Sequence, residues 1–113
     1  MTDPAMRVLH GATKYTAPGA AATHWIDHLR TSHMSLGTYS IPANGTDDQG
    51  PHSEDEIYVV VTGKATLDVD GQRVAVDSGS VVFVGAEVPH SFTAIEQDLT
   101  VLVLFAPPYS GRG

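Results

Sequence analysis

Turn-forming residues recur about every 8 to 12 positions from residue 34 onward, and this spacing confines the chain to short elements. The segments between the turns are rich in Val, Ile, Thr and aromatic residues, which favour strands. No window repeats its apolar residues with the period of a helix, and only residues 24–33 fit a strand and a helical turn equally well. Strands are expected over 34–41, 56–62, 64–70, 72–76, 80–84, 91–95 and 99–105.

Such a series of short strands predicts an all-β fold, either a sandwich or a barrel. The 113 residues are enough for one domain and too few for two. Residues 1–23 end in a stretch of Ala, Pro and Gly, and we expect them to form a weakly structured N-terminal arm. We place the barrel over residues 24–108 and a C-terminal tail over residues 109–113.

The dipeptide Asp70-Gly71 predicts a β-hairpin, because it is a preferred sequence for a two-residue type I′ turn. This turn sets the register of the two strands, and the register alternates apolar and polar pairs as a half-buried hairpin requires. The expected pairs are Val69 with Gln72, Leu67 with Val74 and Ala65 with Val76 on one side, and Asp68 with Arg73 on the other.

The charge of the chain excludes some classes of partner. Its formal net charge is −7, with only six Lys and Arg residues, so we expect neither nucleic-acid binding nor attraction to an anionic membrane. No cysteine is present, which excludes disulfides and thiolate metal sites. Residues 1–15 lack the apolar core of a signal peptide, and the apolar runs 57–61 and 101–108 are too short to cross a bilayer, so we expect a cytoplasmic protein.

Two of the six histidines, His52 and His90, stand where functional groups of a barrel are usually found. Each follows a proline and lies next to the end of an expected strand, which places it near a barrel mouth. The remaining histidines are expected to be ordinary surface or half-buried residues: His10, His24, His28 and His33.

The spacing around His52 and His90 resembles that of the cupin superfamily, whose motifs are G-x5-H-x-H-x(3,4)-E-x6-G and G-x5-P-x-G-x2-H-x3-N. Three residues separate His52 from Glu56, and six separate Glu56 from Gly63, as in the end of the first motif. Gly79 and His90 have the spacing of the second motif. The resemblance covers roughly residues 34–107 and implies a double-stranded β-helix, or jelly-roll barrel.

The chain departs from these motifs at several positions. The first motif histidine would fall at residue 50, which is glycine, and the preceding Gln49 reaches the same place only if the chain bulges. Gln49 is therefore open to two interpretations, a metal ligand or an ordinary loop residue. In the second motif the expected Pro, Gly and Asn are replaced by Gly85, Glu87 and Ala94, which removes no ligand.

The resemblance implies one divalent metal ion held by His52, Glu56 and His90, with Gln49 as the candidate fourth ligand. Two imidazoles and one carboxylate suit Fe, Mn, Ni or Zn and leave coordination positions open. Since a straight strand would separate residues 52 and 56 by about 13 Å, we expect residues 53–55 to bend and Glu56 to begin a strand. Tyr58 shares the face of Glu56, so we take both as candidate catalytic residues.

Other polar and aromatic residues are assigned ordinary roles. Glu54 and Asp55 compete with Glu56 but do not keep its spacing to Gly63, so they are expected to be solvated turn carboxylates. Asp47 and Asp48 are likewise expected to be solvated loop residues. The aromatic residues expected in the core or the pocket wall are Trp25, Tyr39, Phe83 and Phe92.

Three functions stay open at this point. The resemblance implies a metal-dependent enzyme acting on a small organic molecule, with dioxygenases, isomerases, decarboxylases and lyases as the usual classes. The alternatives are a small-molecule binding or sensor domain without turnover, and a barrel with a purely structural metal. Residues 101–105 are apolar on both faces, which predicts a strand buried on both sides and, together with the unassigned arm, a homodimer.

Overall fold

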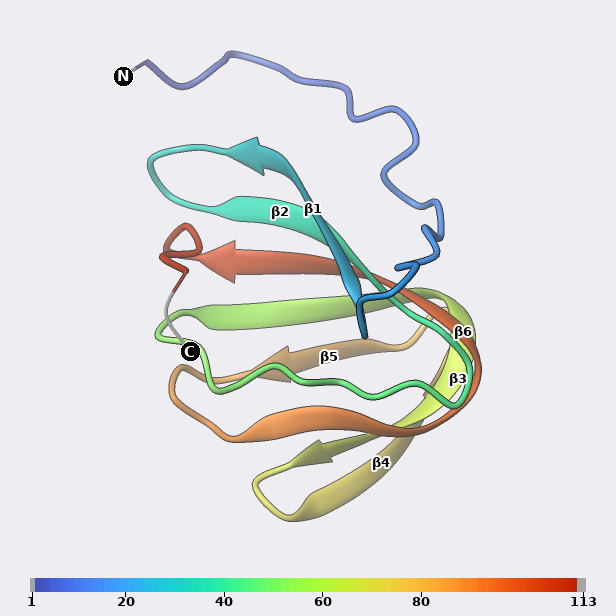
Figure 1. Ribbon diagram of the computed structural model, residues 1–113. Coiled ribbons are helices and arrows are strands. Elements are labelled where there is room, and N and C mark those ends of the chain that lie inside the picture. Colours follow the sequence, from blue (N-terminus) through green and yellow to red (C-terminus); the bar gives the residue numbers. More distant parts are fainter. Residues whose placement is uncertain (1, 112–113) are drawn as a thin grey trace.

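The computed structural model describes residues 2–111, and every regular element in that range is a strand (Figure 1). The strands pair antiparallel in the order β1-β2-β6-β3-β4, with β5 added to β3. The predicted all-β jelly-roll fold is confirmed, and the ambiguous segment after residue 23 forms a strand. Within the described range no helix is long and apolar enough to cross a membrane. The strands are β1 (His24–Arg30), β2 (Ser35–Ile41), β3 (Asp55–Val69), β4 (Gln72–Asp77), β5 (Val81–Val84) and β6 (His90–Ala106).

Two long strands, β3 and β6, form the frame of the barrel and fold back on themselves together (Figure 1). The predicted breaks at Gly63 and at residues 97–98 are therefore wrong, because the strands bend at these places without ending. Three register shifts between Val60 and Thr66 mark the bend of β3, and Gly63 lies among them with a φ of 106°. Bulges of this kind increase twist and turn a strand without breaking its ladder.

The bend brings the two ends of the β3–β6 pair to the same end of the barrel. Glu56 pairs with Phe105 near the start of β3, whereas His90 pairs with Val69 at its end. On a straight strand Glu56 and Val69 would be about 43 Å apart at ~3.3 Å per residue. In the folded pair, the side chains of Glu56 and His90 approach within 2.9 Å.

The core fills the space between the two layers made by the bent strands. Its largest fully buried side chains include Tyr58, Leu67 and Leu99. Trp25 packs at the margin of this core, with its ring against Gly37 on the neighbouring strand. A Cβ at Gly37 would overlap that ring, so the glycine provides the space in which the indole lies.

The predicted hairpin is confirmed in its turn and its register. Asp70 and Gly71 have φ angles of 50° and 82°, as a type I′ turn requires, and all four predicted pairs are present. Arg73 Nε lies 3.5 Å from Asp68 Oδ2 on the outer face. One detail differs, because Val74 is 48% exposed although its partner Leu67 is fully buried. The β4 strand is at the edge of the sheet order, so it is covered less than β3.

The outer face of the sheet carries an apolar row that crosses four strands. Phe83 pairs with Ile57, Ile57 with Leu104, and Leu104 with Leu36. Phe83 is 64% exposed and the other three are half-buried, so the expectation that Phe83 lies in the core or pocket wall is wrong. Residues 101–105 are likewise not buried on both faces within one chain, because Leu102 and Leu104 point outward and stay half-buried.

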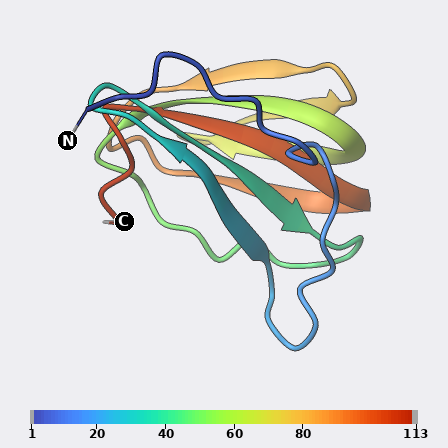
Figure 2. The ribbon, with the colours of Figure 1, turned by 90° about the horizontal axis from the view of Figure 1, so that it is seen from above.

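Residues 2–23 contain no strand or helix, yet they are held against β1, β2 and the loop between them (Figure 2). The hydroxyl of Thr38 donates to the carbonyl of Ala12, which is buried. The amide of Thr16 donates to Ser40 Oγ at 3.1 Å. Of the predicted C-terminal tail, residues 109–111 belong to the range that the structure describes, and residues 112–113 lie outside it.

Candidate metal centre

Three side chains from different parts of the chain converge at one end of the barrel. His52 lies in the loop before β3, Glu56 follows at the start of β3, and His90 begins β6. Each offers a ligand atom within 4.8 Å of the others, and each residue is at most 7% exposed. The bend expected before Glu56 is present, since residues 53–54 form bends and β3 begins at Asp55.

The polar atoms of this cluster are incompletely satisfied by the protein. His90 Nε2 lies 2.9 Å from Glu56 Oε1, but not in the orientation of a hydrogen bond. His52 Nδ1, Glu56 Oε2 and His90 Nε2 are all buried without a hydrogen-bond partner. A buried polar atom left without a partner costs about 1–3 kcal/mol. His90 Nε2 and the carboxylate of Glu56 face each other without a hydrogen bond, an arrangement that a bound cation would relieve, so the residues fit a metal ion.

The orientation of His90 is fixed from behind. Its Nδ1 donates to the Val88 carbonyl at 2.8 Å, which leaves the lone pair of Nε2 facing Glu56. Hydrogen bonds of this kind commonly hold metal-binding histidines in place. Burial lowers the pKa of His90, but the carboxylate of Glu56 and the Val88 carbonyl outweigh it, so the pKa lies above its ordinary value.

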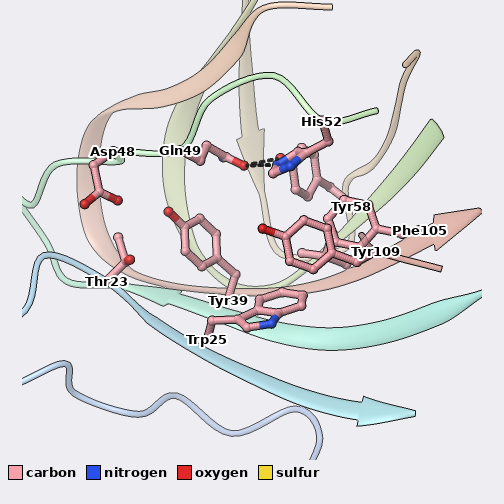
Figure 3. Close-up of a pocket in the computed structure, with 10 residues that line it drawn as sticks. Thr23, Trp25, Tyr39, Asp48, Gln49, His52, Tyr58, Phe105 and Tyr109 are labelled. Carbon is pink, nitrogen blue, oxygen red and sulfur yellow. Dashed lines mark hydrogen bonds between the residues drawn. The ribbon is translucent and has the colours of Figure 1, made fainter. Parts of the chain in front are cut away.

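Gln49 lies beside His52, one member of this cluster (Figure 3). Its Oε1 accepts hydrogen bonds from His52 Nε2 at 3.0 Å and from the Tyr58 hydroxyl at 3.1 Å. Two ligand atoms about 2.1 Å from one ion and at right angles to each other lie about 3.0 Å apart. The Gln49–His52 contact therefore has the separation of two neighbouring ligands, and so does the His90–Glu56 contact.

Asp47 belongs to the hydrogen-bond network beside this cluster, which the sequence did not reveal. Its carboxylate accepts hydrogen bonds from the Tyr39 hydroxyl and from Gln49 Nε2, both at 2.6 Å. It also accepts from the backbone amide of Phe92 at 2.8 Å and from that of Gln49 at 3.2 Å. The expectation of a solvated loop carboxylate is wrong for Asp47. Asp48 beside it is exposed, as expected.

Glu54 and Asp55 do not join the metal cluster, but only Asp55 is exposed. Glu54 is 3% exposed, and its Oε2 accepts hydrogen bonds from Ser53 Oγ at 2.7 Å and from the Ser110 amide at 3.1 Å. Burial raises the pKa of Glu54, but these donors outweigh it and hold the pKa below its usual value. Glu54 is therefore a buried attachment for the C-terminal segment, not the solvated carboxylate we expected.

A cavity of about 230 Å³ adjoins His52 and Gln49 (Figure 3). Half of the described residues that line it are Trp, Tyr or Phe, and none of them is Lys or Arg. The phenol groups in the wall keep their protons, because burial and nearby carboxylates raise the pKa of each tyrosine. The lining residues are Thr23, Trp25, Tyr39, Asp48, Gln49, His52, Tyr58, Val103, Phe105 and Tyr109.

Tyr109 belongs to this wall although the sequence placed it in a tail. Its ring stacks on Phe105 with the ring centres 4.8 Å apart. Its backbone is held at both ends of the residue: Arg30 Nη2 donates to its carbonyl at 2.6 Å, and its amide donates to Ser35 Oγ at 2.8 Å. The only sequence signal was an aromatic residue in an otherwise small and polar terminus.

The other histidines stay outside the cluster. Among the described residues, the group at His52 is the one set of three or more His, Asp and Glu side chains close enough to share an ion. His28 Nε2 lies 2.6 Å from Thr38 Oγ1, which gives it a structural contact on the outer face.

Comparison with known proteins points to one family. A family model described as the Cupin domain matches residues 37–106. An uncharacterised protein of Streptomyces coelicolor is 46% identical over 86 residues, which make up 76% of this chain and 82% of that protein.

Solved structures share the fold. An RmlC-like cupin from Shewanella frigidimarina has a TM-score of 0.73 and 16% identity, with 95% of each chain covered. KdgF from Halomonas sp. has a TM-score of 0.71 and 15% identity, with 86% of this chain and 96% of that one covered. A structure from work on DMSP lyases has a TM-score of 0.70 and 20% identity, covering 80% of this chain and 50% of that one.

Proposed function

Since the chain belongs to the cupin family, we propose that it holds one divalent metal ion and acts on a small organic molecule bound in the adjoining cavity. The ligands would be His52, Glu56 and His90, with Gln49 as the fourth. The observation that carries this proposal is the buried, unpartnered Nε2 of His90 facing the Glu56 carboxylate, with a ligand atom of His52 within 4.8 Å of both.

The donor set limits the choice of metal. Imidazole nitrogens with one carboxylate and one amide oxygen suit Fe, Mn, Ni or Zn. A bound ion with open positions would supply Lewis-acid chemistry to a substrate oxygen.

The side chains around the cluster would supply the remaining chemistry. Glu56 has a second carboxylate oxygen without a partner, which suits it to accept a proton from a bound molecule. Burial and the Glu56 carboxylate raise the pKa of Tyr58 well above its ordinary value, so its hydroxyl stays a donor at neutral pH. Glu56 and Tyr58 are the candidate catalytic residues.

The cavity favours a small ligand without several negative charges. Its volume of about 230 Å³ is below the range of about 300–1,000 Å³ typical of pockets for drug-sized molecules. Aromatic rings would contact the apolar part of the ligand, and among residues 2–111 no cationic side chain lines the wall to neutralise a phosphate or a dicarboxylate. One structural relative comes from work on DMSP lyases, which supports lyases among the possible reactions.

The second candidate is a metal-assisted binding or sensor domain without turnover. Tyr39, Tyr58 and Tyr109 are held as protonated phenols, so none of them is available as a base at neutral pH. Glu56 would then be the single candidate base, and it is also a candidate ligand. Turnover of any compound that binds in the cavity would decide in favour of the enzyme.

The test of the metal site uses Trp25, the single tryptophan of the chain, which lines the cavity together with His52. Elemental analysis of protein purified without added metal, and quenching of Trp25 fluorescence by Ni(II), are expected to give one equivalent per chain. His52→Ala and His90→Ala should each lower occupancy to well below one equivalent. His33→Ala removes an exposed histidine and should leave it unchanged. Full occupancy in both His52→Ala and His90→Ala would refute the site.

We also propose that the chain forms a symmetric homodimer through the apolar row on its outer face. Phe83, Ile57, Leu104 and Leu36 lie in register and form a strip without a charged side chain. Contiguous exposed apolar surface commonly marks a protein interface, and most soluble homo-oligomers are two-fold symmetric. A second copy placed on this face would cover the outward side of β6 that one chain leaves half-buried.

A further inference from the structure

The side-chain amide of Gln49 has two ends with opposite chemistry. The oxygen accepts hydrogen bonds and can bind a cation, whereas the NH2 group only donates and cannot. Rotation of the amide by half a turn exchanges the two ends at almost no cost in shape. The contribution of Gln49 to the cluster therefore depends on which neighbouring group fixes the direction of its amide.

We propose that Asp47 is the positioning residue that sets this direction, an inference that rests on the metal site proposed above. An ionised carboxylate can only accept hydrogen bonds, and Asp47 Oδ2 lies 2.6 Å from Gln49 Nε2. The NH2 end of Gln49 must therefore face Asp47. Its Oε1 is left facing His52 Nε2 and the Tyr58 hydroxyl, both of which are donors in the metal-free protein.

The position of Asp47 is itself determined by the barrel. The hydroxyl of Tyr39, which lies on β2, donates to Oδ1 at 2.6 Å. The backbone amide of Phe92, which lies on β6, donates to Oδ2 at 2.8 Å. Asp47 thus connects two strands to a loop that otherwise has no regular structure, and it transmits their position to Gln49. The neighbouring Asp48 is exposed, and within residues 2–111 it makes no comparable contact.

Two substitutions of Asp47 distinguish the effect of its negative charge from the effect of its hydrogen bonds. Asp47→Ala removes every acceptor and leaves the Gln49 amide free to rotate. Asp47→Asn keeps one amide oxygen, which can accept from Gln49 and Phe92 while its NH2 group donates to the Tyr39 hydroxyl. The alanine variant should therefore lose the fixed direction of Gln49, and the asparagine variant should retain it with a weaker acceptor.

The binding test is a double-mutant cycle on the full chain, with Ni(II) affinity measured by Trp25 fluorescence. Removing a residue that orients a metal ligand typically costs about 10–100-fold in affinity, so Asp47→Ala should weaken binding at least about tenfold. In a Gln49→Ala background the same substitution should have no further effect, because the two residues act as one unit. Asp47→Asn should lie between wild type and Asp47→Ala. Glu96→Ala, which removes an exposed charge on β6, should bind like wild type.

A weakening by Asp47→Ala that is equal with and without Gln49 would mean a general structural effect and would overturn the proposal. So would unchanged Ni(II) affinity in Asp47→Ala when the wild type binds normally.

A second readout needs no metal. The side-chain NH2 resonance of Gln49, assigned by its loss in Gln49→Ala, should be protected from hydrogen exchange in the metal-free wild type and lose that protection in Asp47→Ala. If Asp47→Ala does not fold, Asp47→Asn gives the same test, because a neutral acceptor must move that resonance. A resonance unmoved in either variant, or equally protected in Asp47→Ala, would overturn the role of Asp47. Failure of the wild type to bind Ni(II) would instead refute the proposed metal site and leave this NMR test in force.

Discussion

Replacing Gly63 with alanine is expected to destabilise the fold and weaken the metal cluster at the same time. Gly63 lies at the bend of β3, which returns the strand so that Val69 pairs with His90 beside Glu56. A change that opens this bend would move the two halves of the β3–β6 pair apart. Since Glu56 and His90 lie on opposite halves, the separation of their side chains depends on the bend.

The magnitude follows from two costs at Gly63. Its φ of 106° lies in a region that other residues adopt only with strain, at about 1–3 kcal/mol. A Cβ there would lie 2.5 Å from the Asp98 carbonyl oxygen and 2.8 Å from Leu99 Cα, both of which are backbone atoms of β6. Overpacking of this kind costs a further 1–3 kcal/mol or so. Gly63→Ala should therefore lower the free energy of unfolding by about 2–6 kcal/mol.

Gly71→Ala is the matched control, because Gly71 also has a positive φ, 82°, but a Cβ there would meet nothing within 4 Å. Urea unfolding of both variants should show Gly63→Ala to be the less stable by about 1–3 kcal/mol, the cost of the overlap alone. Ni(II) affinity of the folded protein should fall in Gly63→Ala and stay at the wild-type level in Gly71→Ala. Equal destabilisation by the two substitutions, or full Ni(II) affinity in Gly63→Ala, would refute this account of the bend.

Two further predictions concern the surface. Light scattering should give about twice the chain mass of 11.9 kDa, and Phe83→Lys should return the protein to the monomer mass; a wild-type mass near 11.9 kDa would count against the dimer. Hydrogen bonds from the hydroxyl and the amide of Ser32 lower the pKa of Asp3 below its ordinary value of 3.8. The arm is therefore fully attached at a pH above 3.8, and this attachment is lost as the pH falls through the lower pKa that Asp3 has in the folded protein. An NMR titration should give a pKa for Asp3 below 3.8 that rises toward it in Ser32→Ala; equal values would show that Ser32 does not hold the arm.

Local structure was predictable where the responsible residues are neighbours in the chain. Asp70 and Gly71 determine their own turn, and the turn determines the register of β3 and β4. Gly63 was misread because a glycine with positive φ serves equally well in a turn and in a bulge. Only pairing with β6 across the bend distinguishes the two, and that pairing joins residues far apart in the chain.

The candidate site was likewise predictable only in part. The resemblance to the cupin motifs predicted that His52, Glu56 and His90 meet, and their side chains do lie together. Asp47 and Glu54 were misassigned as solvated carboxylates, because a short run of acidic residues before a strand is usually exposed. Their hydrogen bonds are made with groups distant in sequence: the Phe92 amide for Asp47 and the Ser110 amide for Glu54. No local pattern carries that information.

The positions of these residues imply that part of the cavity wall comes from outside the elements that carry the metal cluster. His52, Glu56 and His90 come from the bent β3–β6 pair and the loop before it. Trp25 on β1 and Tyr109 beyond β6 complete the wall, and their rings pack edge to face with centres 6.2 Å apart. The Tyr109 ring also packs edge to face on the ring of His52, with centres 5.5 Å apart, whereas the ring contacts of Trp25 are with other aromatic residues of the wall. A substitution at Trp25 therefore changes what fits beside the ion while the ligands stay in place, whereas one at Tyr109 also changes the packing of His52.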